Sequence, residues 1–167
     1  TLPDGRTVRL RPIRPDDEHR YADFFARVTP ADMRMRFFMA TKSLNHASIA
    51  RLTQIDYRRE MAFVAIEKST GALLGVARMM AGADYKKAEF AVLVVSRLKG
   101  KGLGRRLMQH LIDYATAEGV SELTGTVLAE NHTMLEFCAR LGFAISEDPE
   151  DLGQKIATKR LTAAKAA

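Results

Sequence analysis

The chain has 167 residues, of which 47% are hydrophobic and 28% charged, and its formal net charge is +6. This composition is typical of one globular domain with a single core, and it excludes an intrinsically disordered chain. No apolar run reaches the length of a membrane span, so we expect no membrane association. The single cysteine, Cys138, favours a reducing, cytoplasmic setting. Because the chain does not begin with Met, we expect residues 1–167 to be one domain excised from a larger protein.

The positive charge is compatible with a polyanionic partner, such as nucleic acid, a phosphorylated cofactor or an acidic protein face. Lysines and arginines gather around the glycines of residues 99–106, which favours a phosphate ligand, although a solvated basic surface fits the composition equally well. We expect no nucleic-acid partner, because aromatic residues do not alternate with the basic ones and no recognition motif is found.

The first predicted elements are a strand and three helices. Residues 7–13 alternate in hydropathy and predict a strand. A helix is predicted to begin at Pro15, where acidic residues suit the first turn, and to end near Pro30. Its expected apolar face consists of Tyr21, Phe24, Phe25 and Val28. Two short helices are predicted to follow, over residues 31–38 and from Ser43 or Asn45 to Gln54.

Strands dominate the next part of the chain. Apolar runs at residues 61–67 and 73–80 flank a turn signal and predict a hairpin, and residues 88–95 form the most strand-like run. An amphipathic helix is predicted from Leu103 to Gly119, which has the position of a C′ glycine. The remaining predicted elements are a strand at 123–128, a helix at 131–141, and strands at 143–146 and 155–161. This order predicts an α/β (α+β) domain with a mixed, largely antiparallel sheet.

A glycine-rich segment joins the strand at 88–95 to the amphipathic helix. It reads Val94-Val95-Ser96-Arg97-Leu98-Lys99-Gly100-Lys101-Gly102-Leu103-Gly104-Arg105-Arg106. Backbone N–H groups at the positive end of a helix dipole form an anion site, and glycines allow close approach. A Walker A loop is excluded because glycine follows Lys101, and the dinucleotide fingerprint lacks its last glycine in both registers. A plain turn with packing glycines is the alternative.

Lys99-x-x-Gly102-x-Gly104 resembles Q/R-x-x-G-x-G/A, the coenzyme A pyrophosphate loop of the GNAT superfamily. Lysine in the first position is a mild departure, since this loop acts mainly through its backbone N–H groups. The segment from Asn131 to Phe143 resembles the second GNAT motif, an Asn-headed helix that ends in Leu-Gly-Phe, and residues 10–17 resemble the first strand and helix. The resemblance covers nearly the whole chain and implies the GNAT fold, a mixed, largely antiparallel sheet flanked by helices.

Residues 53–65, 88–94 and 98–108 also resemble the bacterial Pat-type protein lysine acetyltransferases. In that family a GNAT domain is fused to an acyl-CoA-synthetase-like region. The resemblance implies a metal-free transfer of acetyl from acetyl-CoA to the ε-amino group of lysine in an acceptor protein, with acyl-CoA synthetases among the acceptors. The alternatives are acetylation of a small-molecule amine or a protein N-terminus, and a catalytically weak acyl-CoA-binding regulatory domain.

The resemblance assigns the general base to Glu89. Deprotonating a lysine with a pKa of about 10.4 at pH 7 costs about 4.6 kcal/mol, so the reaction needs a positioned proton acceptor. Glu89 lies six residues before Val95, roughly 20 Å of strand, which is comparable to the length of the pantetheine arm. The alternative is a surface glutamate at the end of a strand, in which case Asp56 and Glu60 are the next candidates.

The same resemblance implies the coenzyme A contacts. The cofactor strand is expected to diverge from its neighbour, which frees the backbone groups of Leu93, Val94 and Val95 for the pantetheine. The remaining implied contacts are Lys99, Gly100, Lys101, Gly102, Leu103, Gly104, Arg105 and Asn131. Acceptor contacts are expected among Arg34, Arg36, Asp56 and Tyr57.

Cys138 stands where many GNAT enzymes carry a tyrosine as general acid. We expect it to be a packing residue, since an unperturbed buried cysteine usually packs; proton donation and a cysteine-bound acyl intermediate are the alternatives. The four histidines are scattered without the spacing of metal ligands, so we expect no metal site.

Overall fold

A computed structural model describes residues 5–32, 60–82, 86–98 and 102–161. Most of the helix predicted over 31–38, and all of the helix predicted to end at Gln54, lie outside these residues. The contacts divide the chain into two compact units, a first unit of residues 1–79 and 91–111 and a second unit of residues 80–90 and 112–167. The expectation of one domain over residues 1–167 stays a prediction.

The first unit begins with β1 (Val8–Pro12), η1 (Pro15–Asp17) and α1 (Glu18–Ala26) and continues with β2 (Glu60–Glu67) and β3 (Leu73–Ala81). β1 pairs antiparallel with β2, from Val8 opposite Glu67 to Pro12 opposite Phe63. Six consecutive residues of β2 are buried, so this strand is covered on both faces and its apolar residues run without alternation. The hairpin turn between β2 and β3 contains Gly71, whose φ is +76°.

α1 ends earlier than the sequence predicts. The helix runs to Ala26 with Arg27 as its C-cap, and a separate helix begins at Pro30. Tyr21 and Phe24 are buried as predicted, while Val28 is buried beyond the end of the helix. A proline can occupy only the first turn of a helix without losing a hydrogen bond, so Pro30 starts the next helix rather than ending α1.

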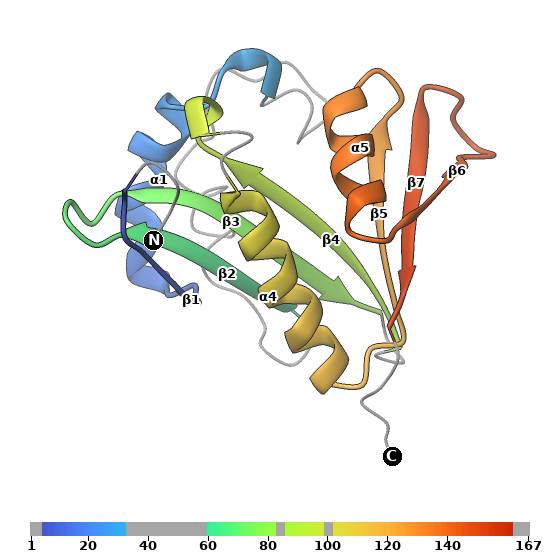
Figure 1. Cartoon of the computed structure of the whole chain (residues 1–167), viewed down its shortest axis with the longest axis horizontal. Helices are drawn as coiled ribbons and strands as arrows, with labels where there is room; N and C mark the ends of the chain where they lie inside the picture. The colour runs from blue at the N-terminus through green and yellow to red at the C-terminus, as the bar shows by residue number, and fades with distance from the viewer. Residues whose placement is uncertain (1–4, 33–59, 83–85, 99–101, 162–167) are drawn as a thin grey trace. The chain divides into compact units, whose positions relative to one another are not determined.

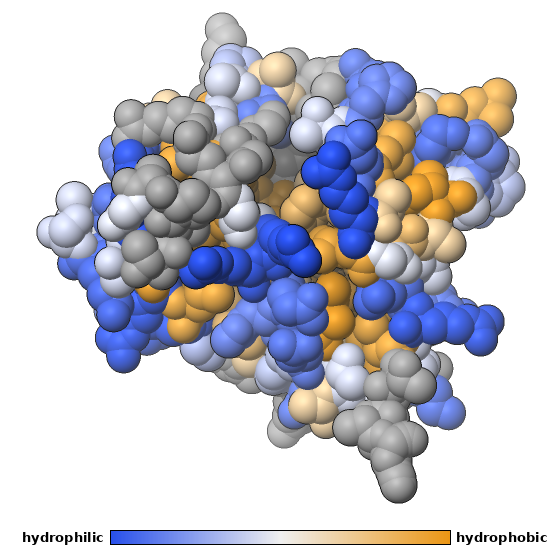
Figure 2. Space-filling model, in the orientation of Figure 1, coloured by the Kyte–Doolittle hydropathy of each residue, from blue (hydrophilic) through white to orange (hydrophobic). Residues whose placement is uncertain are grey.

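The last part of the first unit is the second half of β4 (Lys87–Val94), η2 (Ser96–Leu98) and the first turns of α4 (Leu103–Ala117). Leu103, Leu107 and Leu111 are fully buried, which confirms the predicted i, i+4 apolar stripe. α4 packs closely on β3, because a Cβ at Gly75 would lie 2.8 Å from the Leu107 side chain. Figure 1 shows the first turns of α4 in front of β2 and β3, and Figure 2 shows hydrophilic residues on the outer surface of this helix.

The second unit contains the first half of β4, then β5 (Glu122–Leu128), α5 (His132–Arg140), β6 (Ala144–Glu147) and β7 (Gln154–Arg160). β5 pairs antiparallel with β7 along its whole length, and β7 pairs antiparallel with β6. The aromatic ring of Phe90 packs on Gly125 and on Phe143, whose ring centroid is 5.0 Å away. A side chain at Gly125 would collide with that ring, since its Cβ would lie 2.5 Å from Phe90.

The strand order is β1-β2-β3-β4-β5-β7-β6, and β4 with β5 forms the parallel pair. The predicted mixed, largely antiparallel sheet is therefore confirmed, and each described strand lies within two residues of its predicted bounds. Within the described residues, no helix is long and apolar enough to span a membrane.

Candidate functional site

The connection from β4 to α4 ends in a glycine with a left-handed backbone. Gly102 has a φ of +89°, a conformation that side chains other than glycine rarely adopt. A Cβ at this position would meet no atom of another described residue within 4 Å, so the described part of the chain leaves the space beside this backbone open. The neighbouring predicted contacts Lys99, Gly100 and Lys101 lie outside the described residues.

The first turn of α4 supplies backbone N–H groups suited to an anion. The first hydrogen bond of the helix runs from the Arg106 N–H to the Gly102 carbonyl at 3.1 Å, and the N–H groups before it have no partner within the helix. The Leu103 side chain is fully buried and anchors this turn, so only its backbone faces a ligand. Gly104 is half-buried, whereas Arg105 and Arg106 are exposed. This turn combines backbone donors, a helix dipole and two cations, which suits a phosphate.

The residue after β4 is hydrogen-bonded to two neighbouring elements. The Val95 N–H donates to the Leu74 carbonyl at 2.9 Å, and the Val95 carbonyl accepts from the Leu98 N–H at 2.9 Å. The Val95 N–H is therefore paired with β3, while its carbonyl oxygen can still accept a second hydrogen bond, and its predicted cofactor contact stays a prediction. The side chains of Leu93 and Val94 are half-buried, and the predicted role of their backbone groups stays a prediction.

Glu89 is exposed on β4 in the second unit. It is opposite Thr124 in the last of the three recorded residue pairs between β4 and β5, although β4 continues to Val94. The family resemblance implies that the cofactor strand diverges from its neighbour, and the pairing of β4 with β5 ends at Glu89. Thr124 is in turn opposite Thr158 on β7, and their Oγ1 atoms lie 3.5 Å apart. Paired residues point to the same face of a sheet, so the Glu89 carboxylate and two hydroxyls lie in one row.

The two threonines of this row are not evident from the sequence. Threonine is common in strands, so neither residue stands out by type. The pattern of residues 123–128 does predict which of them share a face. It does not predict which residue of β4 or β7 comes opposite Thr124, because that register depends on the assembled sheet.

Asn131 caps α5, as expected for an Asn-headed helix. Its side-chain Oδ1 accepts a hydrogen bond from the Met134 N–H at 3.2 Å. The side-chain oxygen Oδ1 of Asn131 is therefore used in capping the helix. The predicted contact of this residue with coenzyme A stays a prediction.

The family is decided by residues 28–143, which match the model of the acetyltransferase (GNAT) family. The chain belongs to this GNAT family. A relative, an acetyltransferase from Pseudomonas aeruginosa, is 37% identical over 158 residues, which cover 93% of this chain and 85% of the relative.

Two further comparisons concern Pat proteins. Acetyltransferase Pat from Mycolicibacterium smegmatis is 29% identical over 150 residues, which cover 89% of this chain and 44% of that protein. This chain thus spans less than half of that relative. The crystal structure of the GNAT domain of S. lividans PAT superposes with a TM-score of 0.88 at 27% identity, covering 96% of this chain and 94% of that one.

GNAT proteins use acetyl-CoA as the acetyl donor, and the described part of the loop fits its pyrophosphate. Gly102 faces open space at the start of α4, and Arg105 and Arg106 add positive charge there. No cluster of three or more His, Cys, Asp or Glu side chains able to hold a metal is found among the described residues. The expected acceptor contacts Arg34, Arg36, Asp56 and Tyr57 lie outside them.

Cys138 is fully buried in α5. Burial raises the pKa of its thiol to about 11, because the thiolate would lose its hydration. At neutral pH the side chain is therefore a neutral thiol, which is a poor nucleophile. This environment agrees with the expected packing role.

We predict that Cys138→Ala keeps kcat within several-fold of the wild-type value. The reason is that a buried, protonated thiol takes no part in a direct transfer. Steady-state kinetics measures kcat. Intact-mass analysis of the wild-type protein after mixing with acetyl-CoA shows whether an acetyl group becomes attached to the protein, and we expect none. An acetyl group found on Cys138, or a loss of activity as large as that expected for Glu89, would contradict direct transfer.

Proposed function

We propose that this GNAT chain transfers acetyl from acetyl-CoA directly to the ε-amino group of a lysine in an acceptor protein, with Glu89 as the general base. The observation that carries the proposal is the course of β4. This strand bears an exposed carboxylate at Glu89, at the last recorded pair with β5, and leads through η2 to the glycine turn of α4.

In this proposal the pyrophosphate of coenzyme A binds the N–H groups of residues 102–105, and Lys99, Gly100 and Lys101 complete the loop. The pantetheine follows β4 back toward Glu89. The strand from Glu89 to Val95 is roughly 20 Å long at about 3.3 Å per residue, comparable to the extended pantetheine arm. The backbone groups of Leu93 and Val94 are the proposed partners of its amides.

The chemical step forms an N–C bond between the lysine amine and the thioester carbonyl carbon and breaks the C–S bond. Glu89 takes a proton from the amine, directly or through a water molecule. Its exposure allows an acceptor lysine to reach it. The departing thiolate takes a proton from solvent, because the Cys138 thiol is fully buried.

A protein acceptor is supported by the similarity to Pat proteins along most of the chain. The part of the Pat relative that this chain does not cover also supports a role within or beside a larger assembly. We propose an acyl-CoA-synthetase-like region as that partner.

Matched peptides test the acceptor class through release of the coenzyme A thiol. The first peptide has one internal lysine and a blocked N-terminus, and the second has arginine in place of lysine and a free N-terminus. Thiol release with the first peptide alone is expected, because the proposed acceptor is the ε-amine. Release with the second peptide, or with free amino acids alone, would favour N-terminal or small-molecule acetylation instead.

A pair of glycine variants tests the cofactor loop. Gly102 and Gly119 have φ values of +89° and +88°, and a Cβ at either would meet no atom of the other described residues within 4 Å. Alanine at either position therefore incurs a similar backbone strain, about 1–2 kcal/mol. We predict that Gly102→Ala weakens acetyl-CoA binding by about 10-fold or more, equivalent to about 1.4 kcal/mol, while Gly119→Ala leaves it unchanged.

Calorimetric titration with acetyl-CoA gives both affinities, and thermal unfolding verifies that the two variants lose similar stability. Equal affinities of a folded Gly102→Ala variant and the wild type would remove this turn from the cofactor site.

A further inference from the structure

Ser96 ties the start of the cofactor loop to a distant part of the first unit. It is the first residue of η2, directly after β4. The Ser96 Oγ accepts a hydrogen bond from the Thr29 N–H at 2.8 Å and donates one to Asp32 Oδ2 at 2.5 Å. The Ser96 N–H donates to the Arg27 carbonyl at 3.1 Å. Three hydrogen bonds thus join one residue of η2 to residues 27–32.

The Ser96 hydroxyl completes the cap of the helix that begins at Pro30. Thr29 is the N-cap of this helix, because its Oγ1 accepts from the Asp32 N–H at 3.1 Å. In an ordinary capping box the side chain of the third helical residue, here Asp32, would accept from the N-cap N–H. In this protein the Thr29 N–H goes to Ser96, and Ser96 in turn donates to the Asp32 carboxylate. The Ser96 hydroxyl therefore lies between the Thr29 N–H and the Asp32 carboxylate, which would bond directly in an ordinary capping box.

This arrangement holds the beginning of the loop from two sides. Val95 is fixed to β3 through the Leu74 carbonyl, and Ser96 is fixed to Thr29 and Asp32. A hydrogen bond to a carboxylate is stronger than one between neutral groups, so Asp32 makes the second anchor firm. A backbone that binds an anion must be held in one conformation, and holding a glycine costs more conformational entropy than holding any other residue. A fixed starting point reduces that loss when a ligand binds.

We propose that Ser96 is a positioning residue for the cofactor loop, acting together with Thr29 and Asp32. It sets the direction in which the chain leaves β4 and thereby the placement of the N–H groups that bind the pyrophosphate. This inference rests on the proposed function. Ser96 itself touches neither the reacting atoms nor the acetyl group in this proposal.

Ser96→Ala removes both side-chain hydrogen bonds and should weaken coenzyme A binding by about 10-fold, as expected for losing one to two such bonds. Calorimetry with coenzyme A measures this Kd. The KM for acetyl-CoA should rise by a similar factor, while kcat at saturation should fall much less. Ser96→Thr, which keeps the hydroxyl, should restore most of the affinity.

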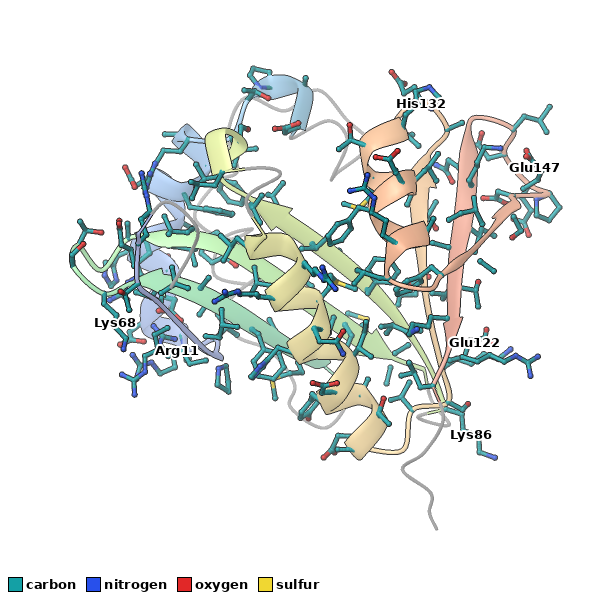
Figure 3. All side chains as sticks on the ribbon, in the orientation of Figure 1. Arg11, Lys68, Lys86, Glu122, His132 and Glu147 are labelled. Atoms are coloured by element: carbon teal, nitrogen blue, oxygen red, sulfur yellow. The ribbon has the colours of Figure 1, made fainter. Side chains whose placement is uncertain are left out.

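Ser121→Ala is a matched control. The Ser121 Oγ donates to the Lys86 carbonyl at 3.0 Å in the second unit, so this variant also loses a serine hydroxyl bonded to another segment. Lys86 is labelled in Figure 3. We expect Ser121→Ala to bind coenzyme A like the wild type.

Asp32→Ala provides a second route to the same result. The Kd of the double variant Ser96→Ala/Asp32→Ala for coenzyme A should not exceed the higher Kd of the two single variants. The reason is that both changes break the hydrogen bond between Ser96 and Asp32. Should Ser96→Ala not fold, Asp32→Ala alone must still raise the Kd.

These measurements distinguish a failure of the positioning role from a failure of the proposed function. Folded Ser96→Ala and Asp32→Ala variants with the wild-type Kd and only a lower Tm would overturn the positioning role and leave the proposed function intact. A wild-type chain that binds no coenzyme A would overturn the proposed function and this inference together.

Discussion

Replacing Glu89 with glutamine is expected to lower kcat by about 10²–10⁴-fold at pH 7, the usual contribution of a general base. Glutamine keeps the size of the side chain but cannot accept the amine proton. Glu89 is exposed, so the substitution should disturb neither the core nor the sheet. Acetyl-CoA affinity should remain close to the wild-type value, because the proposed cofactor contacts are the backbone groups of Leu93 and Val94, the loop and the first turn of α4, and the Glu89 side chain is not among them.

The pH dependence distinguishes a base from a residue that only orients the substrate. As the pH rises toward the lysine pKa of about 10.4, more of the acceptor amine is neutral in solution. The activity of Glu89→Gln should therefore approach that of the wild type at high pH. Measurements of kcat between neutral and alkaline pH, with calorimetry for acetyl-CoA, give both quantities.

Glu122→Gln is the control for this experiment. Glu122 lies on β5 opposite Lys87, the residue two positions before Glu89, and it is labelled in Figure 3. The same chemical change on the neighbouring strand should leave kcat nearly unchanged. A fully active Glu89→Gln enzyme at pH 7 would move the base to another acid, with Asp56 and Glu60 as the next candidates. An equally large loss of acetyl-CoA binding would instead mean that Glu89 is structural.

Asp17→Asn is expected to destabilise the protein by about 3 kcal/mol, the lower end of the range for breaking a buried ion pair. Asp17 is fully buried, and both its oxygens bind Arg11 at 2.6 and 2.8 Å. It also accepts from the Arg14 N–H at 2.8 Å and from Arg20 at 3.0 Å. Arg20 also donates a hydrogen bond to the Gly71 carbonyl at 2.9 Å. The Asp17 carboxylate thus links β1 and the start of α1 directly, and the β2–β3 turn through Arg20.

The stabilisation by Asp17 should depend on pH. Burial alone raises the pKa of this carboxyl, but the hydrogen bonds from Arg11 and Arg14 and the charges of Arg11 and Arg20 outweigh it and hold the pKa below its ordinary value. A lowered folded-state pKa gives stability that is present above the unfolded pKa of about 3.9 and is lost as the pH falls through the folded value. The difference between wild type and Asp17→Asn should therefore shrink in acid.

Denaturant unfolding at neutral and acidic pH measures this difference. Asp16→Asn is the matched control, since the Asp16 side chain is 70% exposed and its contact with Arg14 is 3.7 Å long. That neighbouring change should alter the free energy of unfolding by less than about 0.5 kcal/mol. A similar cost for both variants would show that the Asp17 cluster adds no particular stability.

Local signals in the sequence predicted most of the described elements. Gly119 marks the end of α4 with a φ of +88°, and Asn131 caps α5, because both signals act on their own helix. The predicted end of α1 near Pro30 was wrong, because a proline can begin a helix as well as follow the end of one. The turn at Gly102 was predicted because glycine is the residue that most easily adopts the left-handed backbone found there, with a φ of +89°.

The contacts between distant segments were not predictable in the same way. Ser96 and Asp32 are 64 positions apart, and a serine after a strand carries no sign of the helix cap that it completes. Likewise, Asp17 was recognised as an acid in a first turn, but its buried partner Arg11 comes from β1. Such bonds depend on where the assembled sheet places each segment, which periodicity and capping rules do not describe.

The most direct test of the proposed transfer is tandem mass spectrometry of acceptor proteins after incubation with this chain and isotopically labelled acetyl-CoA. The labelled acetyl group should be found predominantly on lysine ε-amino groups, at levels far above those with Glu89→Gln or without enzyme. Label confined to protein N-termini, or unlabelled proteins together with intact acetyl-CoA binding, would contradict lysine acetylation by this chain.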